Sequence, residues 1–199
     1  MTESKTQKTK RELLEAAQRV LIKDGYAVLS TRRIGEAAST QMSQIQYHFG
    51  SKEGLILALF EHMNDGLVER QGQTFNDPTL SVSQKWALAC DYLDEDIASG
   101  YVRVLQELIA AGWSNPSIGN AVRCALSMWH ELLTDLVAEA TKKHGPLGPL
   151  SNEGMAALIA SAFIGAEALI LLGYEDRVHP IRQALRQVGV ALEKLESAI

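Results

Sequence analysis

Residues 40–55 read TQMSQIQYHFGSKEGL, a segment that gathers uncharged hydrogen-bonding side chains on one short element. It holds three glutamines, a tyrosine and a histidine, and its first charged side chain is a lysine near its end. A helix face that meets only water usually carries many charged residues. Glutamine donates and accepts at once, which suits a bidentate bond to adenine in the major groove, and serine or tyrosine can reach phosphates or base edges. The segment therefore indicates contact with another hydrogen-bonding surface.

A helical phase of about 100° per residue divides this segment into two faces. Met42, Ile45 and Phe49 fall on one side, and we expect them to pack inward. The opposite side carries the polar residues, with two more of them near the packed edge at the ends. The candidate contact residues on this helix are Gln41, Ser43, Gln44, Gln46, Tyr47 and His48.

Short segments on either side complete the candidate site. Thr31 and Arg32 open a short helix before the polar one. Two short helices joined by a turn, the second of them polar, describe a helix-turn-helix, which places its second helix in the major groove. Gly50 then ends one helix and Ser51 can cap the next. Lys52 follows on a first turn whose backbone N–H groups also favour an anion, so we expect it to contact a phosphate.

The charge distribution supports a polyanion partner for the N-terminal end. The chain of 199 residues has a formal net charge of −5. Residues 1–52 nevertheless contain nine Lys/Arg and five Asp/Glu, whereas the rest contains 10 and 19. This asymmetry suggests a polyanion-binding head on an acidic body, although charge leaves chance clustering on solvated faces open. Within the body we expect the acidic run at 91–96, DYLDED, to be a solvated face.

Helices alone position these residues. Apolar side chains recur at helical spacing, and glycines, prolines and capping residues separate the periodic segments. We therefore predict an all-α chain of about nine helices, with a helix-turn-helix domain over residues 1–52 and a helical body over residues 53–199. The expected helices are 5–24, 31–38, 41–49, 52–72, one through 86–97, 101–113, 116–143, 151–173 and one that begins near 180.

Composition favours a cytoplasmic location. Cys90 and Cys124 lack the paired spacing of a disulfide framework. The polar segment at the N-terminus is followed by no apolar signal region. The most apolar run, 155–172, is interrupted by Glu167, which favours a buried helix over a membrane span, so we expect no membrane association.

The last two predicted helices suit an interface between two copies of the chain. Ile181, Leu185, Val188, Leu192 and Leu195 repeat with the spacing 4-3-4-3, a two-heptad apolar seam. The preceding helix is rich in alanine and glycine, which let helices approach closely. Such a pair fits a four-helix interface in a homodimer. Packing inside one monomer is the alternative, since two heptads are too short to decide.

The segment at 30–61 resembles the DNA-binding segment of the TetR family of bacterial transcriptional regulators. The matching residues are Gly25, Tyr26, Arg32, Ile34, Ile45, Tyr47, His48, Phe49 and the stretch 50–55. The resemblance covers about fifty residues with the first helix, and beyond it only length and helix count agree. It implies a homodimer that binds a palindromic operator in double-stranded DNA, and a repressor released by a small effector. The DNA contacts that it implies are Thr31, Arg32, Gln41, Ser43, Gln44, Gln46, Tyr47, His48 and Lys52.

The chain departs from the family pattern beside its reading surface. Ser39 stands where the turn usually has glycine, Thr40 where an apolar residue is usual, and Leu29 where a Ser or Thr cap is common. Gln46 and Met42 also replace residue types that the family prefers. We expect strain at Ser39 if its φ is positive. We also expect an operator sequence that differs from those of the family, because these changes lie on or beside the reading surface.

In this family the C-terminal body binds a small effector and dimerises. The resemblance therefore implies a ligand site among aromatic and soft side chains, for a small apolar or aromatic effector. A carboxylate in an apolar helix could also meet a cationic group, helped by cation–π contact with tryptophan. The candidate residues are Phe60, Met63, Trp86, Cys90, Trp113, Met128, Trp129, Phe163 and Glu167. Ordinary core packing is the alternative for each.

Other function classes have weaker support. An activator, or a regulator without a small ligand, would use the same fold. A helical hydrolase is a further alternative, but His130-Glu131 lacks the second histidine of the H-E-x-x-H pattern, because position 134 is threonine. There is no Gly-rich phosphate loop and no G-x-S-x-G motif. We expect no catalytic residues, no cofactor and no metal site.

Overall fold

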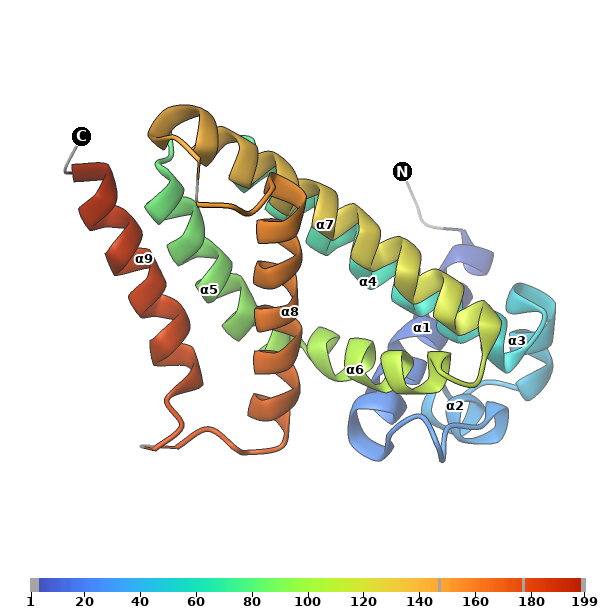
Figure 1. Cartoon of the computed structure of the whole chain (residues 1–199). Coiled ribbons are helices and arrows are strands. Elements are labelled where there is room, and N and C mark those ends of the chain that lie inside the picture. Colours follow the sequence, from blue (N-terminus) through green and yellow to red (C-terminus); the bar gives the residue numbers. More distant parts are fainter. Residues whose placement is uncertain (1–3, 147, 177, 198–199) are drawn as a thin grey trace. The chain divides into compact units, whose positions relative to one another are not determined.

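Nine α-helices and no strand make up the part of the chain described by this computed structural model, residues 4–146, 148–176 and 178–197 (Figure 1). The prediction of an all-α chain of about nine helices is confirmed. The helices are α1 (Lys5–Asp24), α2 (Thr31–Ala37), α3 (Met42–Phe49), α4 (Lys52–Phe75), α5 (Val82–Ser99), α6 (Tyr101–Gly112), α7 (Pro116–His144), α8 (Asn152–Leu171) and α9 (Ile181–Ser197).

Capping residues explain why these helices begin where the sequence predicts. Ser51 Oγ accepts the amide of Gly54 at 2.9 Å before α4. Ser151 Oγ accepts the amide of Gly154 at 3.1 Å before α8. Each bond satisfies one of the N–H groups that a helix start leaves without an intrahelical partner.

The helices form two compact units. Unit 1 contains the chain up to residue 65 together with residues 100–125, and unit 2 contains residues 66–99 and the chain from 126 onward. Helices α4 and α7 each begin in unit 1 and end in unit 2. The predicted boundary between residues 52 and 53 falls inside unit 1, because residues 53–65 and 100–125 belong to the same compact unit as the first three helices.

Apolar packing and a few buried polar bonds hold unit 1 together. The ring of Phe60 stacks on that of Tyr101 with centroids 6.4 Å apart. The Tyr101 hydroxyl donates to Asn64 Oδ1 at 3.0 Å. Glu107 of α6 accepts the backbone amide of Tyr26, two residues after the end of α1, at 3.2 Å. The fully buried side chains of this core include Leu13, Leu21, Ile34, Ile45, Leu55, Ile56, Val102, Leu108 and Ile118.

Unit 2 contains an aromatic cluster between α5, α7, α8 and α9. Trp86 and Trp129 each lie edge-on to Phe163, with ring centroids 5.6 Å and 6.2 Å from it. Cys90 is buried in the same cluster. Trp86 Nε1 donates to the carbonyl of Leu185 at 2.7 Å, which ties α5 to α9.

Ion pairs engage the acidic run of α5. Asp91 and Glu95 are exposed, as predicted for a solvated face, but Asp96 is buried, so the prediction is wrong for Asp96. Arg182 Nε lies 2.7 Å from Asp94, and Arg186 lies 2.9 Å from the same carboxylate. Asp96 is buried and accepts both of its bonds from Arg70 of α4, at 2.8 Å and 2.9 Å. Burial raises the pKa of Asp96, and the bond from Arg70 opposes that rise. The run is acidic because α9 and α4 present arginines to it.

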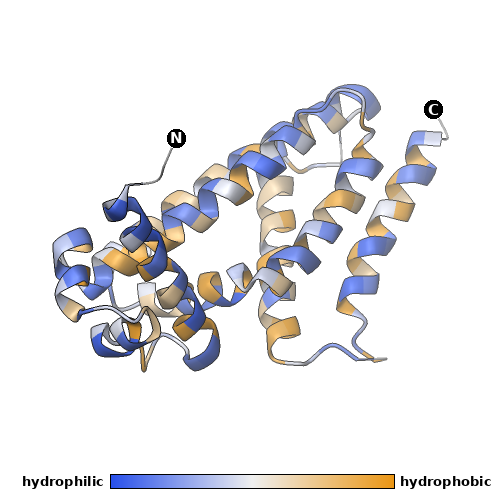
Figure 2. Ribbon diagram, turned by 180° about the vertical axis from the view of Figure 1, so that it is seen from behind, coloured by the Kyte–Doolittle hydropathy of each residue, from blue (hydrophilic) through white to orange (hydrophobic). Residues whose placement is uncertain are grey.

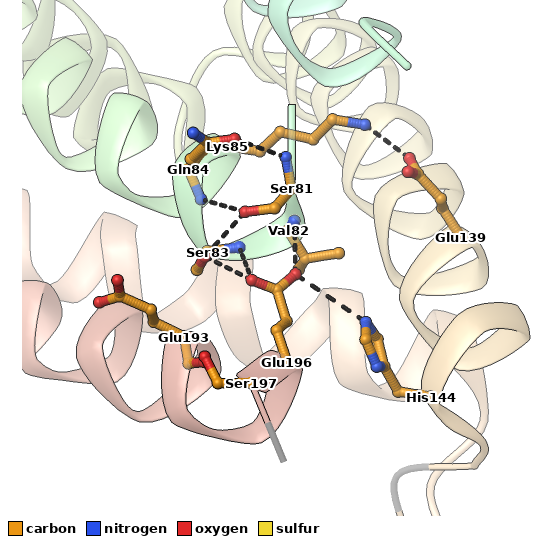
Figure 3. Close-up of polar contacts among 10 residues, drawn as sticks. All are labelled: Ser81, Val82, Ser83, Gln84, Lys85, Glu139, His144, Glu193, Glu196 and Ser197. Carbon is orange, nitrogen blue, oxygen red and sulfur yellow. Dashed lines mark hydrogen bonds and ion pairs between the residues drawn. The ribbon is translucent and has the colours of Figure 1, made fainter. Parts of the chain in front are cut away.

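A polar network joins α5 to α7 and α9 (Figure 3). Glu196 accepts the amides of Val82 at 2.9 Å and Ser83 at 3.4 Å, and thereby caps the start of α5. Lys85 is fully buried and donates from Nζ to Glu139 of α7 at 2.6 Å. These bonds fix the first turn of α5 to α7 and α9.

The residues of the predicted α9 seam occupy two environments. Leu185 and Leu192 pack against the aromatic cluster. Val188 and Leu195 are 42% and 59% exposed. The five residues therefore do not form one buried seam within the chain, because α5 covers only one side of α9.

Helix α8 leaves an apolar stripe uncovered. Figure 2 shows α8 mostly in the hydrophobic range of its colour scale. Leu158, Leu169 and Leu172 are 56%, 38% and 79% exposed, and Ala162 and Gly165 lie between them in exposed positions. By length and composition α8 is the one helix of the described residues that could cross a membrane, which is weak evidence because core helices of soluble proteins meet the same test.

Candidate nucleic-acid interface

Helix α2 is fixed by its cap and by one of its arginines. Ser30 Oγ accepts the amide of Arg33 at 3.3 Å. The Arg33 guanidinium lies 2.8 Å from Asp24 of α1. The side chain of Arg32 is 80% exposed and pairs with Glu36 one turn later at 2.9 Å. An exposed pair of this kind contributes little free energy, so Arg32 is available to a phosphate or a base.

The turn between α2 and α3 contains a residue in the left-handed region. Ser39 has a φ of 52°, so the positive φ considered from the sequence is confirmed. Its amide donates to the Glu36 carbonyl at 3.2 Å, and the amide of Thr40 donates to that of Gly35 at 2.9 Å. This conformation is unfavourable for a residue with a side chain, and the two bonds hold it. The turn thereby sets the angle at which α3 leaves α2.

One buried residue anchors α3. Ile45 is completely buried, and Phe49 is half-buried. The predicted inward position of Met42 is wrong, because its side chain is 53% exposed. The reason lies in α2, which faces the start of α3 with Gly35, a residue that has no side chain to cover Met42.

The outward face of α3 is polar and open. Four of the six predicted contact residues of this helix and its cap are exposed, and Gln44 and His48 are half-buried. Tyr47 is 77% exposed, and its ring lies edge-on to that of His48 with centroids 4.8 Å apart. The exposed residues are Gln41, Ser43, Gln46 and Tyr47. The structure therefore brings the polar residues of the segment 41–48 to one solvent-facing helix.

Lys52 is held at the junction of α3 and α4. Its Nζ donates to the carbonyl of Leu29 at 3.1 Å and lies 5.0 Å from the centroid of the Tyr26 ring. Gly50, with a φ of 74°, ends α3 just before it. An ammonium group has three donors, so the others can still reach a phosphate. The sequence predicts a phosphate contact for Lys52, and the structure adds that its side chain is already held by these two contacts.

An open concavity borders the first turn of α3 on the surface of unit 1. It joins the exposed face of α2 to the start of the polar helix, so Arg32 lies beside the residues that begin α3. The Oγ1 of Thr31 lies 4.0 Å from Met42 Sδ at its edge. The lining residues are Arg32, Gly35, Glu36, Ser39, Thr40, Gln41 and Met42.

The nine predicted ligand residues do not come together as one group. Four of them meet in the aromatic cluster of unit 2, which contains Trp86, Cys90, Trp129 and Phe163. Glu167, one turn beyond Phe163 on α8, is buried. Trp113 and Met128 are 83% and 41% exposed. Phe60, Met63 and Trp113 belong to unit 1. The ligand candidates were chosen by residue type, and residue type does not determine which face of a helix a residue occupies.

Known proteins share both the segment and the fold. The family of "Bacterial regulatory proteins, tetR family" matches residues 13–59, from within α1 into α4. The HTH-type transcriptional regulator UidR of Escherichia coli (strain K12) is 24% identical over 162 residues, which cover 77% of this chain and 76% of UidR. The HTH-type transcriptional repressor AcnR of Corynebacterium glutamicum is 34% identical over 79 residues, which cover 35% of this chain and 42% of AcnR.

A solved structure resembles nearly the whole chain in fold. It is a putative transcriptional regulator from Saccharomonospora viridis in complex with choline, with a TM-score of 0.77 and 17% identity. The superposition covers 94% of this chain and 96% of that one. The shared fold includes unit 2, which lies outside the segment that the family model matches.

Proposed function

We propose, from the premise that the chain belongs to the TetR family of transcriptional regulators, that it represses transcription as a cytoplasmic homodimer on a palindromic operator. The outward face of α3 carries this proposal, because exposed polar side chains stand there on a helix anchored by the buried Ile45. Gln41, Gln46 and Tyr47 would meet base edges, which specify the sequence. Lys52 would hold the phosphate backbone.

The exposed stripes of α8 and α9 support the homodimer. On α8 the stripe runs with the spacing 4-3-4-3 through Leu158, Ala162, Gly165, Leu169 and Leu172. On α9 it runs through exposed positions 184, 188, 191 and 195, which are alanine or larger aliphatic residues. A monomer would leave both stripes in water, whereas a twofold interface covers the same patch on both copies. A dimer of this kind presents two recognition helices to successive major grooves, about 34–36 Å apart.

An inverted repeat in the selected DNA tests this function. The full chain is incubated with a randomised duplex library, and the bound duplexes are amplified and sequenced over several rounds. We expect an inverted repeat whose half-site centres lie about one helical turn of DNA apart. Enrichment of no sequence, or of a single half-site without a repeat, would show that the chain does not bind DNA as this dimer. Placing the selected sequence across the start of a reporter gene then shows repression directly.

A small effector in unit 2 would release the operator. Phe163 of the aromatic cluster with Trp86 and Trp129 lies one turn before the buried Glu167 on α8. Aromatic rings with a carboxylate suit a cationic or aromatic ligand. Helix α4 begins at Lys52 beside the DNA-contacting face and ends in unit 2. Release requires that the ligand bind one arrangement of α4 more tightly than the other.

Tryptophan fluorescence tests the effector proposal. The variant Trp113→Phe removes the exposed tryptophan of unit 1 and leaves Trp86 and Trp129 as reporters in unit 2. It is titrated with choline, which the solved structure with the same fold holds, and with a panel of aromatic amines and acids. We expect one class of these compounds to change the tryptophan emission and to displace the selected duplex. A compound that displaces the duplex without any change in emission would place the effector site elsewhere.

A further inference from the structure

Met42 stands apart from the other residues of the reading surface because it is apolar and exposed. It is the first residue of α3, and its side chain is 53% exposed. Its Cγ lies 3.6 Å from the position that a side chain on Gly35 would occupy, and its Sδ lies 4.0 Å from Thr31 Oγ1. The stem of Met42 is therefore held against α2, and its end lines the open concavity beside Arg32.

We propose that Met42 reads the 5-methyl group of a thymine in each operator half-site, an inference that rests on the DNA-binding function proposed above. The N-terminal residues of a recognition helix are the ones that contact base edges in the major groove. Of the groups displayed there, the thymine methyl is the apolar one, and it is recognised by apolar side chains. Methionine is flexible and polarizable, which lets its end settle against a methyl group.

The surroundings of Met42 favour this reading over hydrogen-bond readout at the same base pair. A thioether sulfur is only a weak acceptor, so it cannot satisfy the polar edges of guanine or cytosine. Covering such an edge without a partner costs free energy, and Met42 therefore disfavours those bases while it favours thymine. Gln41 and Ser43, exposed on either side, can bond to the neighbouring base pairs. We expect the half-site to hold one thymine that is recognised by its methyl group.

Deoxyuridine substitution measures the contact. The duplex is the inverted repeat selected by the wild-type chain, and symmetric thymine pairs are replaced by deoxyuridine one position at a time. Removing one buried methyl group changes an equilibrium constant roughly fourfold, so a symmetric pair changes the affinity of the dimer about fifteenfold. Fluorescence anisotropy at one fixed salt concentration gives the affinities. We expect one symmetric position with a loss of this size in the wild-type protein.

Variants at position 42 assign that loss to its side chain. Met42→Ala should bind thymine and deoxyuridine duplexes within about twofold of each other at that position, and Met42→Leu should keep most of the difference. Gln46→Ala is the matched control, because it weakens binding on the same helix but should leave the methyl dependence in place. Met42→Gln should select adenine at that base pair in a repeated selection, since glutamine pairs with adenine.

The outcomes separate this proposal from the function on which it rests. If the wild-type chain selects an inverted repeat but no thymine position loses its methyl dependence in Met42→Ala, Met42 does not read thymine. If the wild-type chain selects no DNA, the regulatory function itself is wrong. Because Met42 is exposed, its variants should keep the wild-type melting temperature, so a loss of methyl dependence is not a loss of folding.

Discussion

Lys85 and Glu139 form an ion pair whose two members differ in burial, which predicts an asymmetric effect on stability (Figure 3). The Lys85 side chain is 0% exposed and that of Glu139 is 44% exposed, with 2.6 Å between Nζ and Oε2. Removing the carboxylate leaves a buried ammonium without this partner. Removing the ammonium leaves a carboxylate that water already reaches.

We expect Glu139→Ala to lower the free energy of unfolding by about 3 kcal/mol, the lower end of the range for breaking a buried pair, because water already screens this carboxylate. Lys85→Met keeps the buried aliphatic chain and removes the charge with its desolvation cost. Its free energy of unfolding should lie within about 1 kcal/mol of the wild type, or above it. The double variant should resemble Lys85→Met, since the two side chains no longer interact.

Urea denaturation measures these differences. All variants are unfolded at one protein concentration, because the stability of a dimer depends on it, and tryptophan fluorescence reports the transition. Equal slopes of free energy against urea would show that the same surface is exposed in each variant. A loss in Lys85→Met as large as that in Glu139→Ala would refute the reasoning, because it would mean that the attraction outweighs the desolvation of Lys85.

Three further predictions concern the surface, the interface and pH. Tyr47→Ala should weaken binding of the selected duplex by about 1–3 kcal/mol per half-site. Because the ring is 77% exposed, the melting temperature should not change, and a lowered melting temperature would show that Tyr47 has a structural role. Gly165→Arg should convert the proposed dimer to a monomer in analytical ultracentrifugation, since a side chain there meets nothing within 4 Å in the chain itself. Gly66→Arg, equally open on α4, is the control and should leave the oligomeric state unchanged. Burial alone would raise the pKa of Glu196, but hydrogen bonds from Ser83, Ser81 and the backbone lower it overall from its usual 4.5. The stabilisation by Glu196 is therefore complete above that pH and is lost as the pH falls through the lowered pKa. Glu196→Gln should flatten this acid limb of the unfolding profile, and an unchanged limb would contradict the role of Glu196 as a cap.

The helices could be predicted because their ends carry local signals. Gly50, for example, adopts a φ of 74° where the sequence predicts the end of α3, and Ser51 caps α4 as expected. Such signals act within one turn of the chain, so they need no knowledge of the neighbours. Ile45 was placed correctly in the core for a similar reason, since helical phase fixes which side of α3 it occupies.

The remaining features depend on partners from distant parts of the sequence. Met42 shares the phase of Ile45 but is exposed, because the facing residue on α2 is Gly35. Asp96 looked solvated by composition and is buried, because Arg70 lies opposite it. Lys85 carried a usable signal, since it lies on the same helix face as the buried Val82, but its partner Glu139 lies 54 residues away.

The dependence of operator binding on salt tests the DNA-binding function most directly. Affinity for the selected duplex is measured over a series of salt concentrations, and its logarithm is plotted against that of the salt concentration. If Arg32 and Lys52 of each of the two protomers neutralise one phosphate, the slope is about −3.6. A slope near that value, weakened to about −1.8 in Lys52→Ala, is the expected result. Absent binding, or binding that salt does not change, would contradict a phosphate-contacting helix-turn-helix.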